Sequence, residues 1–471
     1  MIDWDSILTG PRQPLTLKGK IDPATTFRVR IEVIDIVPPI WHTLDLVSDL
    51  SLDALHEVIQ AAFGWENRHL HRFHPTPDPY ISDLETIINV GDEDEDAEGI
   101  SEPSLTLDRL FHEPGDSWYY THDFGDDWTH LVTLEGRHSP GSDSLRAVCI
   151  AGERRGPIED SGGAHGYQEV LDAVRDPLHP RHEEVSQWLT FVGKSPGGHD
   201  RIDLSKINDE IAGALALHPR AASDQLKDLI NRCQGVAARN RLARLISSAR
   251  LDSITVDPET ANAMVRPYRW LLDRIGPDGI KLTKAGFLPP VHVKAAVEEL
   301  EVRDWIGAGT VESHTPPVMW LRETATRLGL LRKYRGQLNV TKLGSVLRED
   351  PLRLLAHVAK RIPIARYPIE RDAAMIMFLI TAAGERLVAD QRAWWQAQQA
   401  ERSLIAELLG ALGWRTEGGD RVQADDIGLL VSDDRQIVDL CSAGIDSAII
   451  LRRTEQFRER AQLLARLALV S

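Results

Sequence analysis

The sequence predicts an α+β fold, in which an N-terminal domain of sheet and helices precedes a mainly α-helical half with winged-helix-like modules. In the first 190 residues, segments that alternate apolar and polar residues are mixed with segments of helical periodicity. From Gln225 onward helical periodicity dominates, and short strand–turn–strand patterns interrupt it. We therefore divide the chain into an N-terminal lead (residues 1–22), an α+β domain (residues 23–215) and a helical, winged-helix-like region (residues 216–471).

Length and composition are those of a folded protein with more than one domain. The chain has 471 residues, of which 42% are hydrophobic. Its N-terminus, MIDWDSILTG, has neither the basic lead nor the apolar run of a signal peptide, and no segment has the roughly 20 consecutive apolar residues that cross a bilayer. The three cysteines, Cys149, Cys233 and Cys441, are too widely spaced for a disulfide framework. We expect a cytoplasmic protein with no membrane partner.

Charge is distributed unevenly along the chain. The net charge of −17 argues against a protein that coats nucleic acid with its whole surface. The segment from Arg332 to Arg361, however, contains eight basic residues and only two acidic ones. The opposite bias occurs at Gly91–Glu102, GDEDEDAEGISE, which we interpret as a hydrated loop rather than a cation site because like charges without apolar anchors repel.

The α+β domain begins with strands and a helix. Apolar residues alternate with charged ones from Phe27 to Val33, which is the period of a half-buried strand, and a second extended segment follows at Trp41–Val47. Apolar residues then recur at helical spacing from Ala54 to Phe63, with Ser51 as the N-cap and Gly64 at the C′ position. These segments predict strand, strand and helix.

A short strand and a β-hairpin follow. His69–His74 alternates, with His69, His71 and Phe73 on one face. Trp118–Leu134, WYYTHDFGDDWTHLVTL, alternates on both sides of a three-residue turn at Gly125–Asp127, which would pair His122 with His130 and Phe124 with Trp128. One hairpin face would then carry two histidines among aromatic side chains. Those aromatic residues are Trp118, Tyr120, Phe124 and Trp128.

The end of the domain is expected to be helical. Tyr167–Val174 forms an amphipathic stripe, and Pro180 can open a second helix that carries Val185 and Leu189. The Ser195–Gly198 segment, SPGG, is then typical of a loop.

Five ordered blocks carry a resemblance to a known family. They read FRVRIEVIDIVPPIW, LDALHEVIQAAFGWENRHLHRF, YYTHDFGDDWTH, GPIEDSGGAHGY and DPLHPRHEEVSQWL. This pattern resembles the plasmid pRiA4b ORF-3-like family, some members of which are labelled TnpR-like proteins of insertion elements. The resemblance implies an α+β domain of intracellular bacterial proteins linked by name to mobile elements, and no established activity. A serine recombinase needs an activated serine with clustered arginines, but Ser6 is followed only by Arg12, so we reject a resolvase activity.

The family motif and one departure from it define candidate residues. The motif positions are Tyr120, Asp123, Phe124, Gly125, Asp126, Trp128, His130, Glu159, Asp160, Gly162 and Gly163. Many members of the family have cysteines where this chain has Gly156 and Ser161, and only Cys149 remains. A thiolate metal site of the kind those members would form is therefore incomplete here.

A metal site is the enzymatic hypothesis. Imidazoles on one sheet face converge on a divalent metal ion when strands bring them together, and His69, His71, His122 and His130 fit that pattern. Asp123 or Cys149 would add a further ligand. The alternative is structural, since histidines among aromatic rings also serve as hydrogen-bonding core residues. The aspartates at the hairpin tip are typical of a tight turn, and the motif carboxylates Glu159 and Asp160 lie in a segment typical of a structured loop.

Other common catalytic motifs are absent from the sequence. It contains no GxxxxGK phosphate loop, no GxGxxG after a strand, no HExxH and no GxSxG. His179 and His182 have a spacing that could hold a metal ion, but the proline between them favours helix capping. These observations disfavour nucleotide hydrolysis by a P-loop and the common hydrolase routes.

The helical region contains the winged-helix-like pattern. Val318–Leu347 predicts a helix, a stop at Gly329, a strand, a basic turn, a returning strand and a further helix. Weaker echoes at Ile280–Val293 and Leu404–Leu430 suggest related modules in series. A wing of this kind would present basic side chains to DNA phosphates. Alternatively, this region binds a protein partner or only packs within the fold. The candidate DNA-binding residues are Arg332, Lys333, Arg335 and Lys342.

The sequence thus leaves two hypotheses. The preferred one is a non-catalytic DNA- or protein-binding factor. The alternative is a metal-dependent enzyme centred on the hairpin histidines, with a divalent metal ion as its cofactor.

Overall fold

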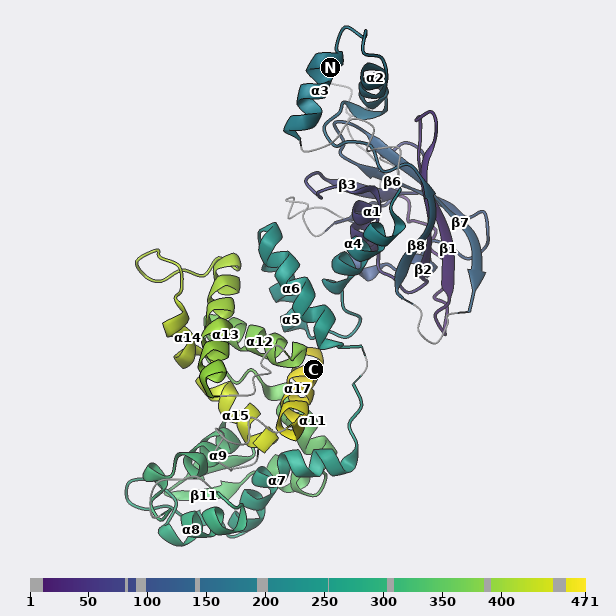
Figure 1. Cartoon of the computed structure of the whole chain (residues 1–471). Coiled ribbons are helices and arrows are strands. Elements are labelled where there is room, and N and C mark those ends of the chain that lie inside the picture. Colours follow the sequence, from purple (N-terminus) through teal and green to yellow (C-terminus); the bar gives the residue numbers. More distant parts are fainter. Residues whose placement is uncertain are drawn as a thin grey trace, which may run out of the picture. The chain divides into compact units, whose positions relative to one another are not determined.

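The computed structural model resolves into two compact units, residues 1–218 and residues 219–471 (Figure 1). The residues that the structure describes are 12–80, 84–89, 99–139, 145–192, 202–252, 254–302, 309–384, 391–443 and 455–471. The acidic run around residues 91–98 and the Ser195–Gly198 segment lie outside them. The architecture is α+β, as predicted, and each unit is described by itself.

Unit 1 is built on a six-stranded antiparallel sheet with the strand order β3-β6-β7-β1-β2-β8. The strands are β1 (Thr26–Val33), β2 (Ile40–Val47), β3 (His71–His74), β6 (Ser117–His122), β7 (Trp128–His138) and β8 (Ala147–Glu153). The predicted strands at Phe27–Val33 and Trp41–Val47 are confirmed as β1 and β2. The edge strand β8 was not predicted, and the parallel pair β4 (Ile87–Ile88) and β5 (Ile100–Ser101) forms a separate small ladder.

Alternation in β1 explains the core of unit 1. Phe27, Val29, Ile31 and Val33 are buried, while the charged residues between them point to the other face. Burying each such side chain stabilises the fold by about 1.5–3 kcal/mol. The helix α1 (Leu52–Phe63) closes this core and packs against α4 (Leu204–Ala216). It ends as predicted, at a left-handed Gly64 (φ 74°).

Two further helices complete unit 1. They are α2 (Gly163–Arg175) and α3 (His182–Phe191), which contact each other. The predicted stripe at Tyr167–Val174 lies in α2, with Tyr167 fully buried. The second helix starts two residues after Pro180, and Nδ1 of His182 donates a hydrogen bond to the Ala173 carbonyl.

The hairpin is confirmed, but its predicted register is wrong. The strands β6 and β7 pair His122 with Trp128 and Tyr120 with His130, rather than His122 with His130. The turn has five residues, 123–127, instead of three. Phe124 consequently lies in the turn, beside Tyr80, and not on the aromatic face. His69 likewise precedes β3 rather than belonging to it.

Unit 2 is mainly helical. Its helices are α5 (Asp224–Arg232), α6 (Val236–Ala249), α7 (Pro258–Ile275), α8 (Pro290–Glu299), α9 (Pro316–Arg327), α10 (Lys342–Arg348), α11 (Pro351–Arg361), α12 (Pro368–Ala383), α13 (Gln391–Ala411), α14 (Ala424–Leu430), α15 (Ser432–Ala443) and α17 (Glu455–Val470). The central one is α12, which is buried from Asp372 to Ala382 and contacts α6, α13 and α17. Its Asp372 accepts hydrogen bonds from Arg232 and from the Trp414 indole. None of the helices that the structure describes is both long and apolar enough to cross a membrane.

One small sheet interrupts these helices. The strands β10 (Leu331–Tyr334) and β11 (Gln337–Val340) form the predicted hairpin, and the two-residue β9 (Ile280–Lys281) pairs with β11. The Ile280–Val293 segment is therefore part of the same sheet module, and its interpretation as a separate earlier module was wrong. At Leu404–Leu430 the described residues form a single bridge between Arg415 and Arg421, without a paired wing.

A buried carboxyl group makes the stability of unit 2 depend on pH. Asp434 of α15 is almost fully buried, and one of its oxygens accepts a hydrogen bond from the Ile364 amide at 2.8 Å. Burial raises the pKa of Asp434 from 3.8 to about 7. The folded state therefore binds a proton that the unfolded state releases between these two pH values. Stability falls as pH rises through that window.

We expect Asp434→Asn to stabilise the protein at pH 8, by at most about 4 kcal/mol, because the amide keeps an acceptor for Ile364 without a buried charge. The gain should shrink at pH 5. Urea unfolding of the full chain at the two pH values measures this, with the exposed Glu417→Gln as the matched control. A lower stability of Asp434→Asn than of the parent at pH 8 would contradict the assignment.

Candidate metal centre

The hairpin turn is shaped by one aspartate. Asp123 has a left-handed backbone (φ 58°), and its Oδ1 accepts hydrogen bonds from the amides of Gly125 (2.9 Å) and Asp126 (3.3 Å). Its carbonyl accepts the Asp127 amide at 2.6 Å. Aspartate tolerates the left-handed region because its side chain bonds to nearby backbone amides. With Oδ1 used by the turn, Oδ2 of Asp123 faces outward to His69.

The turn also holds the loop that leads into α2. Asp126 Oδ2 accepts the Gly162 amide at 3.0 Å, and Gly163 approaches so closely that a Cβ there would lie 2.3 Å from the Asp126 carbonyl oxygen. Glu159 of this loop accepts the Glu66 amide at 3.0 Å. Segments far apart in the sequence, residues 65–69, 122–127 and 157–163, are thereby brought together. This contact explains why the family motif contains Asp126, Gly162 and Gly163.

Three ligand atoms converge between these segments. Nε2 of His69 lies 3.6 Å from Oδ2 of Asp123 and 3.3 Å from Oδ1 of Asp160. The three residues offer atoms that all lie within 4.8 Å of one another. Two ligands bound to one zinc ion at about 2.0–2.2 Å lie about 3.4 Å apart in a tetrahedron, so this spacing fits a shared ion. Asp160 is largely exposed, with 61% of its side chain accessible, which leaves the cluster open on one side.

A second pair adjoins the three-residue cluster. His122 is fully buried, and both of its ring nitrogens lack a hydrogen-bond partner. Its ring lies edge-on to His69, 5.8 Å away, and Nε2 lies 3.8 Å from Oε1 of Glu159, which is also buried without a partner. A buried polar group left unpaired costs about 1–3 kcal/mol. The His122–Glu159 pair therefore has two ligand atoms that the protein itself does not satisfy.

The other predicted metal residues lie elsewhere. Nε2 of His71 is 3.1 Å from Oε2 of Glu102, and the His71 ring stacks on His56 at 3.5 Å. His130 shares its Nδ1 with the carbonyls of Tyr120 (3.2 Å) and Trp128 (3.0 Å). Burial lowers the pKa of His130 to about 3, so this ring is neutral. The structure thus brings together His69 and His122 of the four predicted histidines.

Cysteine does not contribute to the cluster. Cys149 is a buried free thiol on β8 whose Sγ donates to the Ala151 carbonyl, and burial raises its pKa to about 11. The sequence pattern predicts a structured loop at Glu159 and Asp160, and neither residue was among the predicted metal ligands. Their position within a family block was the available signal, but nothing in the linear order places them beside His69.

The remaining motif residues are structural. The Tyr120 hydroxyl lies 2.7 Å from Nδ1 of His56 and accepts the Gln60 side chain at 3.0 Å, which fastens α1 to the sheet. Trp128 is 1% exposed and meets Tyr167 edge-on at 6.2 Å. Phe124 lies under the guanidinium of Arg72, 5.4 Å from its ring centre. These contacts hold the hairpin between helix and loop.

Three of the four predicted DNA-binding residues lie on one hairpin of unit 2, and the fourth begins the next helix. Arg332 and Lys333 are exposed on β10, and Arg335 forms the turn with Gly336, both with positive φ (48° and 76°). Such a two-residue turn matches the twist of a tight hairpin. Lys342 is exposed at the first position of α10. Among the described residues none of these four basic side chains forms an ion pair, whereas Arg322 and Arg327 of α9 are paired with carboxylates.

Comparison with known proteins assigns unit 1 to a family. The model of the plasmid pRiA4b ORF-3-like protein family matches residues 25–198. The uncharacterised protein y4hQ of Sinorhizobium fredii is 30% identical over 198 residues, which are 97% of its own length and 42% of this chain. The chain belongs to the pRiA4b ORF-3-like family. The resemblance inferred from the five sequence blocks is thereby confirmed.

Two further similarities complete the comparison. A family model described as the Y4jL N-terminal domain matches residues 260–353, the part of unit 2 that contains α7, the three-stranded sheet and the start of α11. A crystal structure of a protein of unknown function from Methanosarcina mazei Go1 is 28% identical, with a TM-score of 0.33, and covers 39% of this chain and 97% of its own.

The close approach of the loop to the hairpin turn can be tested at Gly163. We expect Gly163→Ala to lower the free energy of unfolding by about 2 kcal/mol or more, because φ is 67° and the added Cβ would meet the Asp126 carbonyl. Gly136→Ala on β7 is the matched control, since no heavy atom lies within 4 Å of its Cβ position. Denaturant unfolding compares the two, and equal stability of both variants would rule out the proposed contact.

Proposed function

We propose that unit 1 is a metal-binding module that holds one divalent transition-metal ion between the hairpin turn and the loop at residues 157–163. The observation that carries the proposal is the convergence of His69 Nε2, Asp123 Oδ2 and Asp160 Oδ1 beside the unpartnered His122. Three protein ligands with an open fourth position are typical of catalytic rather than structural zinc sites.

The donor set indicates which ions fit. Imidazole nitrogen combined with carboxylate oxygen suits zinc, iron and manganese, whereas magnesium prefers an all-oxygen octahedron that keeps several waters. A ligand set with two aspartate side chains favours a divalent cation. The whole unit favours cations too, because residues 1–218 contain 17 Lys and Arg against 40 Asp and Glu.

The open side of the cluster determines the chemistry that such an ion would support. Asp160 is the exposed ligand, and Asp123 and His69 lie deeper. An ion held there would activate a water molecule or polarise an oxygen of a bound substrate. Glu159, 3.8 Å from His122, is placed either to complete the ligand set or to accept a proton from that water. We propose a metal-dependent hydrolytic reaction of this type, with the substrate left open.

Zinc binding tests the metal proposal directly. We expect the full chain to bind one equivalent of Zn²⁺ in isothermal titration calorimetry, and His69→Ala, His122→Ala and Asp160→Asn each to weaken binding at least about tenfold. Mg²⁺ at the same concentration should bind far more weakly.

The control for this titration is His165→Ala, which removes an exposed histidine of α2 outside the cluster. It should bind zinc like the parent chain. Thermal unfolding of each variant without metal separates a lost ligand from a lost fold. If folded His69→Ala binds zinc with the affinity of the parent chain, the proposed site is wrong.

A second function, DNA contact by unit 2, rests on a different observation. The element order α7, β9, α8, α9, β10, β11, with the sheet order β10-β11-β9, is the order of a winged-helix domain. In such domains the third helix enters the major groove and the hairpin touches the phosphate backbone. Here the basic hairpin tip is the exposed part, whereas Arg322 of α9 is engaged with Glu312.

The charge of unit 2 supports the DNA proposal. Residues 219–471 contain 37 Lys and Arg against 31 Asp and Glu, a net charge of +6, although the whole chain carries −17. Phosphate contacts draw on concentrated Lys and Arg. A hairpin with Arg332, Lys333 and Arg335 provides three such contacts without reading a base sequence.

We expect salt-sensitive binding of random-sequence duplex DNA, measured by fluorescence anisotropy of the full chain. The triple variant Arg332→Ala/Lys333→Ala/Arg335→Ala should lower the slope of log affinity against log salt by about 3, since each lost phosphate contact removes about 0.9. Arg415→Ala/Arg421→Ala removes two exposed basic side chains elsewhere in unit 2 and is the control. Absence of binding at low salt, or equal loss in the control, would defeat the DNA proposal.

A further inference from the structure

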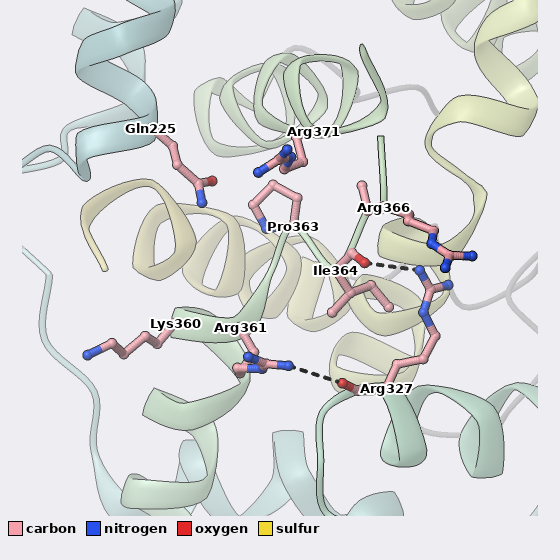
Figure 2. A pocket seen from close by; sticks show the side chains of 9 residues that line it. Gln225, Arg327, Lys360, Arg361, Pro363, Ile364, Arg366 and Arg371 are labelled. Atoms are coloured by element: carbon pink, nitrogen blue, oxygen red, sulfur yellow. Dashed lines mark hydrogen bonds between the residues drawn. The ribbon is translucent and has the colours of Figure 1, made fainter. Parts of the chain in front are cut away.

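A basic pocket lies in unit 2, and none of the residues that line it belongs to the β10–β11 hairpin. Its volume is about 490 Å³, and nine residues line it: Gln225, Arg327, Lys360, Arg361, Pro363, Ile364, Ala365, Arg366 and Arg371 (Figure 2). Five of the nine are Lys or Arg, and none is Asp or Glu. They come from α5, the ends of α9 and α11, the segment between α11 and α12, and the first turns of α12. The volume is that of a small-molecule site.

The five cations differ in how they are engaged. Arg327 forms an ion pair with Asp433 and donates to the Ile364 carbonyl at 3.0 Å, and Arg361 donates to the Arg327 carbonyl at 3.4 Å (Figure 2). These two arginines thus frame the pocket. Lys360, Arg366 and Arg371 are exposed, and their side chains form no ion pair among the described residues. Three cationic groups are therefore available to a ligand.

The carboxylates next to these residues are already engaged. Asp433 is paired with Arg327, and Glu370 caps α12 by accepting the amides of Arg366 (3.0 Å) and Tyr367 (3.2 Å). Asp434 is buried, and one of its oxygens accepts the Ile364 amide. The pocket lining itself contains five cations and no acid, so its like charges repel one another. An anion in the pocket would relieve this repulsion.

We propose that this pocket binds a small molecule with a multiply charged phosphate group, of the diphosphate or triphosphate class. The three unpaired cations Lys360, Arg366 and Arg371 would contact the phosphate oxygens, and Arg361 lies beside them. Guanidinium groups suit this ligand because their fork of N–H donors matches two phosphate oxygens at once. The apolar residues Pro363, Ile364 and Ala365 provide a wall for the rest of the molecule.

The shape of the site favours a small ligand over a nucleic-acid backbone. The wing residues Arg332, Lys333 and Arg335 are exposed on a protruding hairpin, whereas the pocket cations surround a cavity. A duplex backbone offers singly charged phosphates about 3.4 Å apart along each strand, and convex basic surfaces contact it. Figure 2 shows Lys360 and Arg366 at opposite sides of the pocket, with Arg361 and Arg371 between them. A diphosphate or triphosphate group has several charged oxygens and can contact cations on more than one side of a pocket.

Calorimetric titration of the full chain tests the pocket, with inorganic pyrophosphate and ATP as probes. We expect both to bind, and Arg366→Gln/Arg371→Gln to lower their affinity at least tenfold. Lys360→Gln should lower it as well, by a smaller factor. Arg415→Gln/Arg421→Gln, which removes two exposed arginines that do not line the pocket, should bind like the parent.

Three results would overturn the proposal. One is that neither probe binds at low salt, and another is that the control double variant loses as much affinity as the pocket double variant. The third is that a random DNA duplex depends on Arg366 and Arg371 while pyrophosphate and ATP do not, which would make the pocket part of a nucleic-acid surface. Thermal unfolding confirms that each variant is folded, and the wing triple variant should bind pyrophosphate normally.

Discussion

The candidate metal centre depends on the conformation of one residue, Asp123. Its left-handed backbone and the two amides bound by Oδ1 fix a five-residue turn between β6 and β7. That turn sets the pairing of His122 with Trp128 and presents Asp126 to Gly162. The remaining oxygen of Asp123 then faces His69. The side chain of Asp123 thus fixes the turn, places Asp126 where it binds the second loop, and offers an oxygen to the candidate metal site.

Most strands and helices of unit 1 could be predicted from the sequence, but the residue pairing in its β6–β7 hairpin could not. The strand at Phe27–Val33 and the helix ending at Gly64 follow from local alternation, helical spacing and a glycine C-cap. The hairpin partner of His122 does not follow from alternation, because shifting the strand pairing by two residues leaves every side chain on the same face of the sheet. The length of the turn decides which residue pairs with His122. That length depends on the left-handed backbone of Asp123, which the alternation of apolar and polar residues does not encode. The edge strand β8 lacked a comparable signal.

The candidate sites, too, could be predicted from the sequence only in part. Histidines before and on the hairpin were predicted as candidate ligands, and His69 and His122 do lie together. Asp160 reaches His69 through long-range contacts of its loop, among them the approach of Gly163 to the turn. In unit 2 the basic β10–β11 hairpin could be predicted from a local sequence pattern. The partner strand Ile280–Lys281 lies more than 50 residues earlier, and the pocket at Arg366 draws on several helices, so neither could be inferred from sequence alone.

The two units have opposite net charges, and the proposals above assign a cation site to the acidic unit and phosphate binding to the basic one. The measurement that tests the account of unit 1 most directly is X-ray absorption spectroscopy of the zinc-loaded protein. We predict a first shell of nitrogen and oxygen only, with imidazole scattering that decreases in His69→Ala. Sulfur in that shell, or an ion surrounded by water alone, would contradict the convergence of His69, Asp123 and Asp160 on one metal ion.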